Sequence, residues 1–228
     1  MKADDAVAAL VARCRPLLGD LRQLATPPTY PDSLALCVIE AVQSPGISHS
    51  VVEAVVGRYR AYRATSGGNA DTDGAVELLA SFRDLGTEGW MKQIGTRNRT
   101  PPRPGAPFKA EVIERAASVL VELGAASTAE VRVAAEDPAK LAELHAGWSA
   151  VVGRGTGATW HYLLILAGVP GVKPDRLIAR FVSDATGVPS RLLETAAAGR
   201  LLELAATELG VSSAILDFHV WDWQRRLR

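Results

Sequence analysis

Apolar residues recur three and four positions apart along most of this chain, and this spacing constrains the fold more than any other feature of the sequence. The spacing is typical of helices that bury one face against a core. The strict alternation of apolar and polar residues that marks a half-buried strand hardly appears. The sequence therefore predicts an all-α fold.

Proline and glycine divide the chain into predicted helices. The stiff segment 25–31, rich in proline, separates a leading helix over about residues 4–24 from the rest of the chain. Further helices are predicted over about residues 33–43, 48–64, 71–82, 108–123, 138–145 and 161–167. The candidate N-caps include Asp32 or Ser33, Asp71 or Asp73, and Asp137.

Composition and charge exclude several classes of protein. The chain has 228 residues, of which 48% are apolar, so it can build a core and is not a disordered segment. Lys and Arg number 25 and Asp and Glu number 25, so any basic surface must be local. The longest central apolar run, Tyr162–Ala167, is far shorter than the roughly 18 residues of a spanning helix, and Met1–Asp5 lacks a signal-peptide pattern. We expect a cytoplasmic protein with no membrane partner.

The cysteines and histidines do not form a metal-binding pattern. Cys14 and Cys37 lack the Cys-x-x-Cys spacing of zinc and iron–sulfur sites. The histidines form no pair three or four positions apart. We therefore expect no metal, no iron–sulfur cluster and no other cofactor.

The most basic window of the chain, residues 92–109, is interrupted by prolines and contains no acidic residue. Such a window cannot form a continuous helix, and a stiff loop loses little entropy when it binds backbone phosphates. An exposed loop without a partner is the alternative interpretation. The basic residues of the window are Lys92, Arg97, Arg99, Arg103 and Lys109, of which Arg97, Arg99 and Arg103 are our candidate DNA-binding residues.

Closely spaced glycines precede the helix predicted over about residues 161–167. Gly153, Gly155 and Gly157 let the backbone approach a partner closely, and the following helix presents free amide donors at its start. The expected ligand is an anion, most simply a phosphate. The segment does not fit the Walker pattern, and no predicted strand precedes it as a dinucleotide-binding fold requires. A tight turn between two helices is the alternative interpretation.

The glycine segment is part of a longer pattern, which consists of Gly153, Gly155, Gly168, Pro170 and Asp175. In order and spacing, without gaps, this pattern resembles the helix-hairpin-helix DNA glycosylase superfamily of endonuclease III and the alkyladenine glycosylases. In that family a glycine hairpin precedes a catalytic aspartate. Further similar segments are residues 94–98, 109–110, 175–181 and 216–221.

The resemblance implies a two-lobed fold, with a helical barrel domain over residues 29–166 that contains the hairpin and a second lobe from residues 1–28 and 167–228. It implies a monofunctional DNA N-glycosylase in base-excision repair, because Gly157 stands where bifunctional members carry their Schiff-base lysine. Alkylated bases are the preferred substrate class, since members that repair alkylation also lack this lysine and the iron–sulfur cluster. The expected partner is double-stranded DNA with a damaged base, bound by a nucleoid-associated monomer.

The resemblance also assigns roles to single residues. Asp175 is the expected catalytic carboxylate, which stabilises positive charge on the sugar, and an N-cap is its compatible structural role. Asp217 and Asp222 are expected to be structural or solvated. The residues expected to contact backbone phosphates in the hairpin are Gly153, Arg154, Gly155, Thr156 and Gly157.

Another set of residues is expected to handle the extruded base. Gln43 loosely matches the family's plugging glutamine, and Thr96 or Arg97 is the candidate wedge on the opposite side. Trp160 and His161 lie within one turn of the hairpin helix start and are candidates for the base pocket. For each of them, an ordinary surface or core position is the alternative.

Two further function classes remain open at the level of sequence. A non-catalytic DNA-binding or interaction module would keep the glycosylase fold and lose the chemistry. An enzyme acting on a small nucleotide would use the glycine hairpin to hold a free phosphate.

Overall fold

A computed structural model describes residues 3–19, 27, 29–152 and 157–226. In this part of the chain the regular structure is helical, and the only β-type pairing is an isolated bridge between Arg99 and Phe108. The predicted all-α class is therefore confirmed. None of the helices in these residues is long and apolar enough to cross a membrane.

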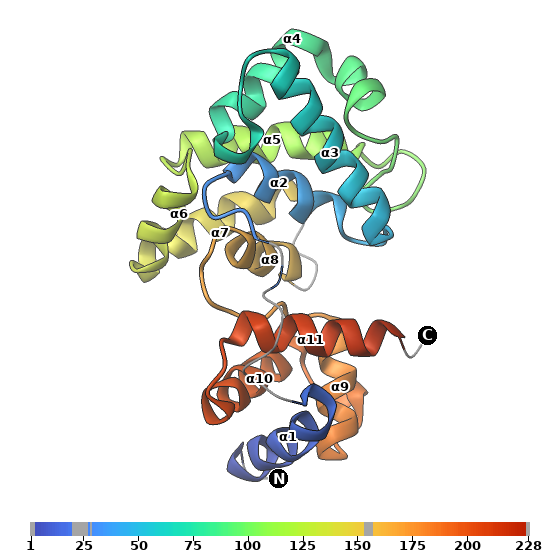
Figure 1. The fold of residues 1–228 in the computed structure, drawn as a ribbon, viewed down its shortest axis with the longest axis vertical. Coiled ribbons are helices and arrows are strands. Elements are labelled where there is room, and N and C mark those ends of the chain that lie inside the picture. The colour runs from blue at the N-terminus through green and yellow to red at the C-terminus, as the bar shows by residue number, and fades with distance from the viewer. Residues whose placement is uncertain (1–2, 20–26, 28, 153–156, 227–228) are drawn as a thin grey trace. The chain divides into compact units, whose positions relative to one another are not determined.

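The helices are short to medium in length, and the connections between them include a long loop over residues 94–108 (Figure 1). The α-helices are α1 (Ala3–Leu18), α2 (Leu34–Gln43), α3 (His49–Thr65), α4 (Ala75–Gln93), α5 (Lys109–Glu122), α6 (Thr128–Ala135), α7 (Pro138–Val152), α8 (Ala158–Leu166), α9 (Arg176–Thr186), α10 (Thr195–Leu209) and α11 (Ser213–Arg226). The 3-10 helices are η2 (Ala70–Thr72) and η3 (Ser190–Leu192).

The chain folds as two compact units. The terminal unit consists of Met1–Pro28, Gly155–Ile165 and Pro170–Arg228, and the central unit consists of Thr29–Arg154 and Leu166–Val169. The sequence placed residues up to 166 in one domain with the central helices, whereas in the structure the described residues 157–165 group with the C-terminal helices.

The central unit is built around α2, whose ten residues are all buried. A helix that is apolar nearly all round belongs in a core rather than on a surface, and α3, α4 and α5 pack around it. Ser33 begins α2 as predicted, because its Oγ accepts the Leu36 N–H at 3.2 Å. The C-terminus of α2, at Gln43, lies next to the loop that follows α4, where Thr96 contacts Gln43.

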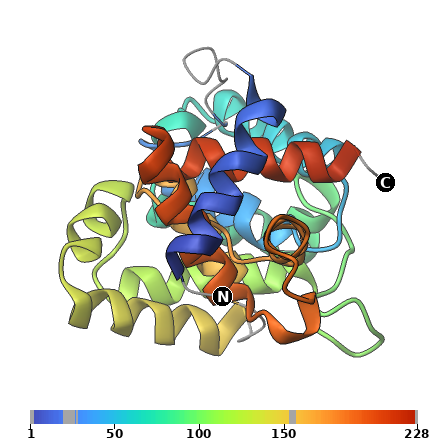
Figure 2. The ribbon, with the colours of Figure 1, turned by 90° about the horizontal axis from the view of Figure 1, so that it is seen from below.

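The terminal unit packs α1, α9, α10 and α11 around one apolar core. In Figures 1 and 2, α1 lies against α9 and α10, and α11 also packs on both of these helices. The buried residues of α9 recur at helical spacing, at Ile178, Ala179, Phe181 and Val182. This spacing turns one face of α9 to the core, and α11 packs on the same helix.

Several helix boundaries differ from those predicted. α4 begins at Ala75, after Gly74, rather than at Asp71 or Asp73, and it continues to Gln93 across a break at Gly86, where φ is 65°. α7 continues to Val152, beyond the predicted end near residue 145. α6 was not predicted, although Ser127 and Glu130 form a capping box at its start.

Candidate active site

Asp175 lies at the N-terminus of α9 as predicted. Its Oδ1 accepts the backbone N–H groups of Leu177 at 2.7 Å and Ile178 at 3.1 Å. Both donors bond to the same oxygen, and within the described chain no hydrogen bond reaches Oδ2. The half-buried carboxylate is thus held in one orientation by the helix start while one oxygen stays available.

Asp217 of α11 is a second carboxyl group next to this site. Its side chain is 9% exposed, and its Oδ1 accepts the Lys173 N–H at 3.2 Å. The next hydrogen bond along the chain is local, because the Asp175 N–H donates to the Lys173 carbonyl at 2.8 Å. Burial, with a further contribution from the negative charge of Asp175, raises the pKa of Asp217 to about 8. Asp217 therefore carries a proton at neutral pH.

Lys173 contributes an ammonium group next to Asp175 and Asp217. Its Nζ lies 4.0 Å from the centre of the Tyr162 ring, which α8 contributes, so the ammonium is held by a cation–π contact. We define the Asp175 cluster as Lys173, Asp175, Asp217 and Tyr162. In this cluster the oriented Asp175 carboxylate can stabilise a developing positive charge, and the neutral Asp217 carboxyl group holds a proton.

The sequence analysis missed Asp217 as a member of this site. Of the two expected roles, structural or solvated, the structure agrees with the first, because the Asp217 side chain is buried and accepts the Lys173 N–H. A signal was present, since Leu216 and Val220 are buried and Asp217 lies on the same stripe of the helix. Asp222, by contrast, is half-buried and pairs with Arg225 at 2.8 Å and Arg226 at 2.5 Å.

The glycine hairpin falls mostly outside the described residues, which leave out Gly153, Arg154, Gly155 and Thr156. Gly157 is described and has a φ of 74°, a conformation that favours glycine. Its carbonyl accepts the N–H groups of Trp160 at 3.0 Å and His161 at 3.1 Å. Gly157 therefore lies immediately before α8, where both the hairpin and the tight-turn interpretations place the start of a helix.

The two candidate residues of the base pocket have other partners. Trp160 is only 3% exposed, so its ring is not available for stacking with a base in this structure. His161 is half-buried, and its Nδ1 lies 3.0 Å from the Gly157 carbonyl, to which it donates. The pocket assignment of Trp160 is corrected to a core position.

The basic window 92–109 separates into residues with different roles. Arg97 is 67% exposed and pairs with Glu88. The Arg99 guanidinium lies 3.8 Å from the centre of the Phe108 ring and donates to the Ala106 carbonyl. Arg103 is exposed and has no hydrogen bond or ion pair from its side chain among the described residues. Of the three predicted phosphate contacts, Arg103 is the one whose side chain makes no hydrogen bond or ion pair among the described residues.

Lys109 does not belong to the exposed part of this window. It is 1% exposed, and its Nζ donates to the carbonyls of Gln43 at 2.6 Å and Pro45 at 2.8 Å. Burial lowers the pKa of this lysine to about 8. Lys109 thus satisfies carbonyl groups at the C-terminus of α2 and is not available to phosphate.

The predicted wedge residues lie side by side in the central unit. The Thr96 hydroxyl lies 3.5 Å from the Gln43 Oε1. Gln43 is fully buried, however, and its Nε2 has no hydrogen-bond partner among the described residues. A fully buried side chain cannot enter the space left by an extruded base without a change in structure. The role of Gln43 is therefore corrected to a core position, and Thr96 remains half-buried beside it.

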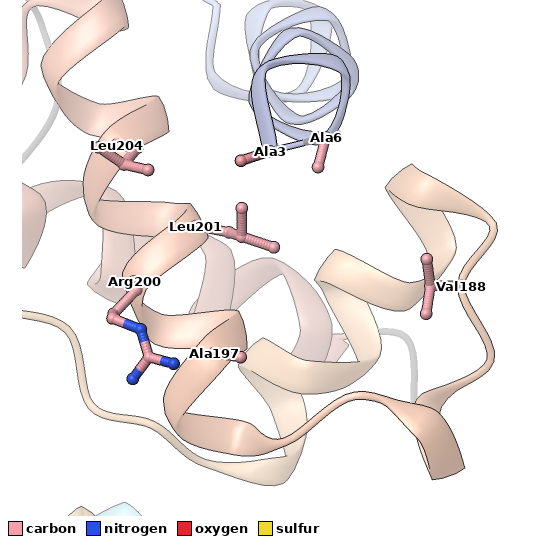
Figure 3. A pocket seen from close by; sticks show the side chains of 7 residues that line it. All are labelled: Ala3, Ala6, Val188, Ala197, Arg200, Leu201 and Leu204. Atoms are coloured by element: carbon pink, nitrogen blue, oxygen red, sulfur yellow. The ribbon is translucent and has the colours of Figure 1, made fainter. Parts of the chain in front are cut away.

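A separate cavity of about 440 Å³ lies in the terminal unit, between α1 and α10 (Figure 3). Its lining is apolar apart from Arg200, and it includes Leu201 and Leu204 of α10 and Ala3 and Ala6 of α1. None of the predicted site residues lines it. The Asp175 cluster is therefore a different place on the same unit.

Fold and cluster together define an all-α protein with an oriented aspartate at a helix start. The chain belongs to the family described as "Domain of unknown function (DUF8548)", whose model matches residues 8–225. Neither the curated proteins nor the solved structures contain a match to the chain.

Proposed function

We propose that this protein is a monofunctional DNA N-glycosylase of the helix-hairpin-helix type, which removes a damaged base in base-excision repair. The observation that carries the proposal is the Asp175 carboxylate, which is fixed through Oδ1 at the start of α9 while Oδ2 makes no hydrogen bond among the described residues. Alkylated bases are the proposed substrate class, by analogy with members that lack the lyase lysine.

The chemistry requires a negative charge that is already in position. Breaking the bond between the sugar C1′ and the base nitrogen develops positive charge on the sugar, and the electron pair of that bond leaves with the base. A carboxylate beside the sugar stabilises this transition state more than the ground state, and it can orient or deprotonate the attacking water. Asp175 is the proposed residue for both steps.

Binding of the duplex is assigned to two segments. Arg103 and Arg97 of the loop between α4 and α5 present exposed guanidinium groups. The start of α8 at Gly157 would bind a backbone phosphate through amide donors. These interactions read no bases, so the binding should show little sequence preference.

A second candidate function is a DNA-binding module without catalysis. It is favoured by the burial of Gln43 and Trp160, because neither side chain is available to fill the duplex or to stack on a base. The two functions differ in one observable, which is the release of a base.

The test is a panel of duplexes that each carry one damaged base, alkylated purines included. We expect release of the free base from at least one duplex, and an intact strand that alkali then cleaves. Borohydride should trap no adduct, because Gly157 has no amine and the Lys173 ammonium lies against Tyr162. Binding of every duplex without release of any base would favour the non-catalytic module. An adduct that is absent in Lys173→Ala would contradict the monofunctional assignment.

The contribution of the basic loop can be measured through salt dependence. We expect the double variant Arg97→Ala and Arg103→Ala to bind duplex more weakly than the wild type. The slope of log affinity against log salt should become shallower by about 0.9 for each phosphate that the variant no longer neutralises. Arg83→Ala removes an exposed arginine of α4 outside the loop and should leave the slope unchanged. An equal slope in the double variant would exclude the loop from the interface.

A further inference from the structure

We propose that Asp217 is the positioning residue for Asp175: its carboxyl group accepts the Lys173 N–H and so anchors the backbone segment that leads into Asp175. This inference rests on the proposed function, because it assigns a partner to the residue that carries the chemistry. It adds a residue of α11 to a site that the sequence pattern places at the start of α9 alone.

Asp217 is hydrogen-bonded to the backbone of the segment 173–175, which leads into α9. Pro174 has no N–H, and the Asp175 N–H is occupied by the Lys173 carbonyl at 2.8 Å. The Lys173 N–H donates to Asp217 Oδ1 at 3.2 Å, which ties this segment to a neighbouring helix. The Asp175 carboxylate is fixed on its other side by the amides of α9. Removal of the Asp217 carboxyl group would therefore free the residues that lead into Asp175.

The charges around Asp217 explain why one carboxyl group of the pair stays neutral. The groups that act on it are Asp175 and Lys173 from the entry to α9 and Glu203 from α10. Burial, followed by the charge of Asp175, raises the pKa of Asp217, and Lys173 opposes this rise. Asp175 is the less buried of the two carboxyl groups, and its Oδ1 accepts two amide donors.

A neutral Asp217 suits a site that must form next to phosphate groups. Two adjacent carboxylates would repel each other and the phosphate groups of the DNA backbone. One carboxylate and one neutral carboxyl group together carry a single negative charge. Ionisation of Asp217 would change the charge beside the reacting sugar. We therefore expect the rate of base release to depend on the protonation of Asp217 as well as on Asp175.

The first experiment measures the anchor without any substrate. Hydrogen exchange of the Lys173 amide is followed by NMR in the full chain for the wild type, Asp217→Asn and Asp217→Ala. Asparagine keeps an acceptor oxygen, so exchange should stay within about threefold of the wild type, whereas alanine should speed it at least about tenfold. Unchanged exchange in a folded Asp217→Ala protein would overturn the proposal.

The same spectra give a second readout, which does not require Asp217→Ala to fold. In the wild type, the Lys173 amide shift should titrate with a midpoint near pH 8 as its acceptor ionises, and Asp175→Asn should lower that midpoint because a neighbouring negative charge is removed. Asp217→Asn should remove the titration. A Lys173 amide without such a midpoint in the wild type would contradict the proposal, even if Asp217→Ala fails to fold.

The second experiment follows base release, in single turnover from pH 6 to pH 9.5, on a lesion duplex from which the wild type releases the damaged base. We expect the pH profile of the wild-type rate to change slope near the pH at which the Lys173 amide shift has its midpoint. The profile of Asp217→Asn should lack that change. Asp217→Ala should lower the rate by about ten- to a hundredfold at every pH, and Asp217→Asn should restore it at neutral pH. Equal rates and profiles in all three proteins would overturn the positioning role. If the wild type releases no base from any duplex, the proposed function fails and the amide measurements still decide the role of Asp217.

Discussion

Replacing Asp175 by asparagine is expected to lower the single-turnover rate of base release by at least about a hundredfold, while duplex affinity stays equal or increases. Asparagine retains an acceptor oxygen for the amides of Leu177 and Ile178, so the start of α9 should be preserved. The variant therefore removes the negative charge and little else. Release of the free base and binding of the same duplex are measured separately, so that a defect in chemistry is distinguished from a defect in binding.

Asp137 provides a matched control for this substitution. It caps α7 in the central unit, where its Oδ1 accepts the N–H groups of Ala139 at 2.9 Å and Lys140 at 3.3 Å. Asp137→Asn thus changes an N-cap in the same way outside the Asp175 cluster. The single-turnover rate of base release by this variant should stay within about threefold of the wild-type rate. Full activity in Asp175→Asn would refute the assigned mechanism and direct attention to Asp217 or to Glu40, which accepts a hydrogen bond from Tyr30 at 2.6 Å.

Helix starts could be predicted because the hydrogen bonds that form them are local. Ser33, Asp137 and Asp175 each bond to amides within three residues, so the sequence around each one contains the whole signal. The end of α7 was harder to predict, because the residues near its predicted end contain neither glycine at a left-handed position nor proline.

The roles of Asp217 and Lys109 depend on packing between distant segments. Asp217 meets Lys173 only because α11 packs on α9, and Lys109 meets Gln43 only because α5 packs on α2. The same limit applies to the basic window, whose residues are adjacent in sequence. The structure buries Lys109, places Arg99 on Phe108 and leaves Arg103 exposed. Local charge density could identify the window but not the residues that remain available for phosphate.

A buried carboxyl group also makes a prediction about stability. The pKa of Asp217 is about 8 in the folded protein, against about 3.9 for an aspartate in an unfolded chain. Between these pH values the folded state binds one proton more than the unfolded state. The free energy of unfolding of the terminal unit should therefore fall as pH rises through this window, by about 1.4 kcal/mol per pH unit from this group, and this decrease should end above pH 8.

Asparagine has no proton to lose, so the free energy of unfolding of Asp217→Asn should not show this decrease with pH. At pH 8 we expect the variant to be more stable than the wild type by about 3 to 5 kcal/mol, and near pH 4 the two should be similar. Urea unfolding followed through NMR signals of the terminal unit measures this difference. Asp222→Asn is the control on the same helix: although partial burial acts against it, the hydrogen bonds from Arg225 and Arg226 hold the pKa of Asp222 below its usual range. Removing that charge should lower stability slightly at pH 8, so the two variants should differ in sign. An Asp217→Asn protein that is less stable than the wild type at pH 8 would mean that Asp217 is charged in the fold and that its bond to Lys173 depends on that charge.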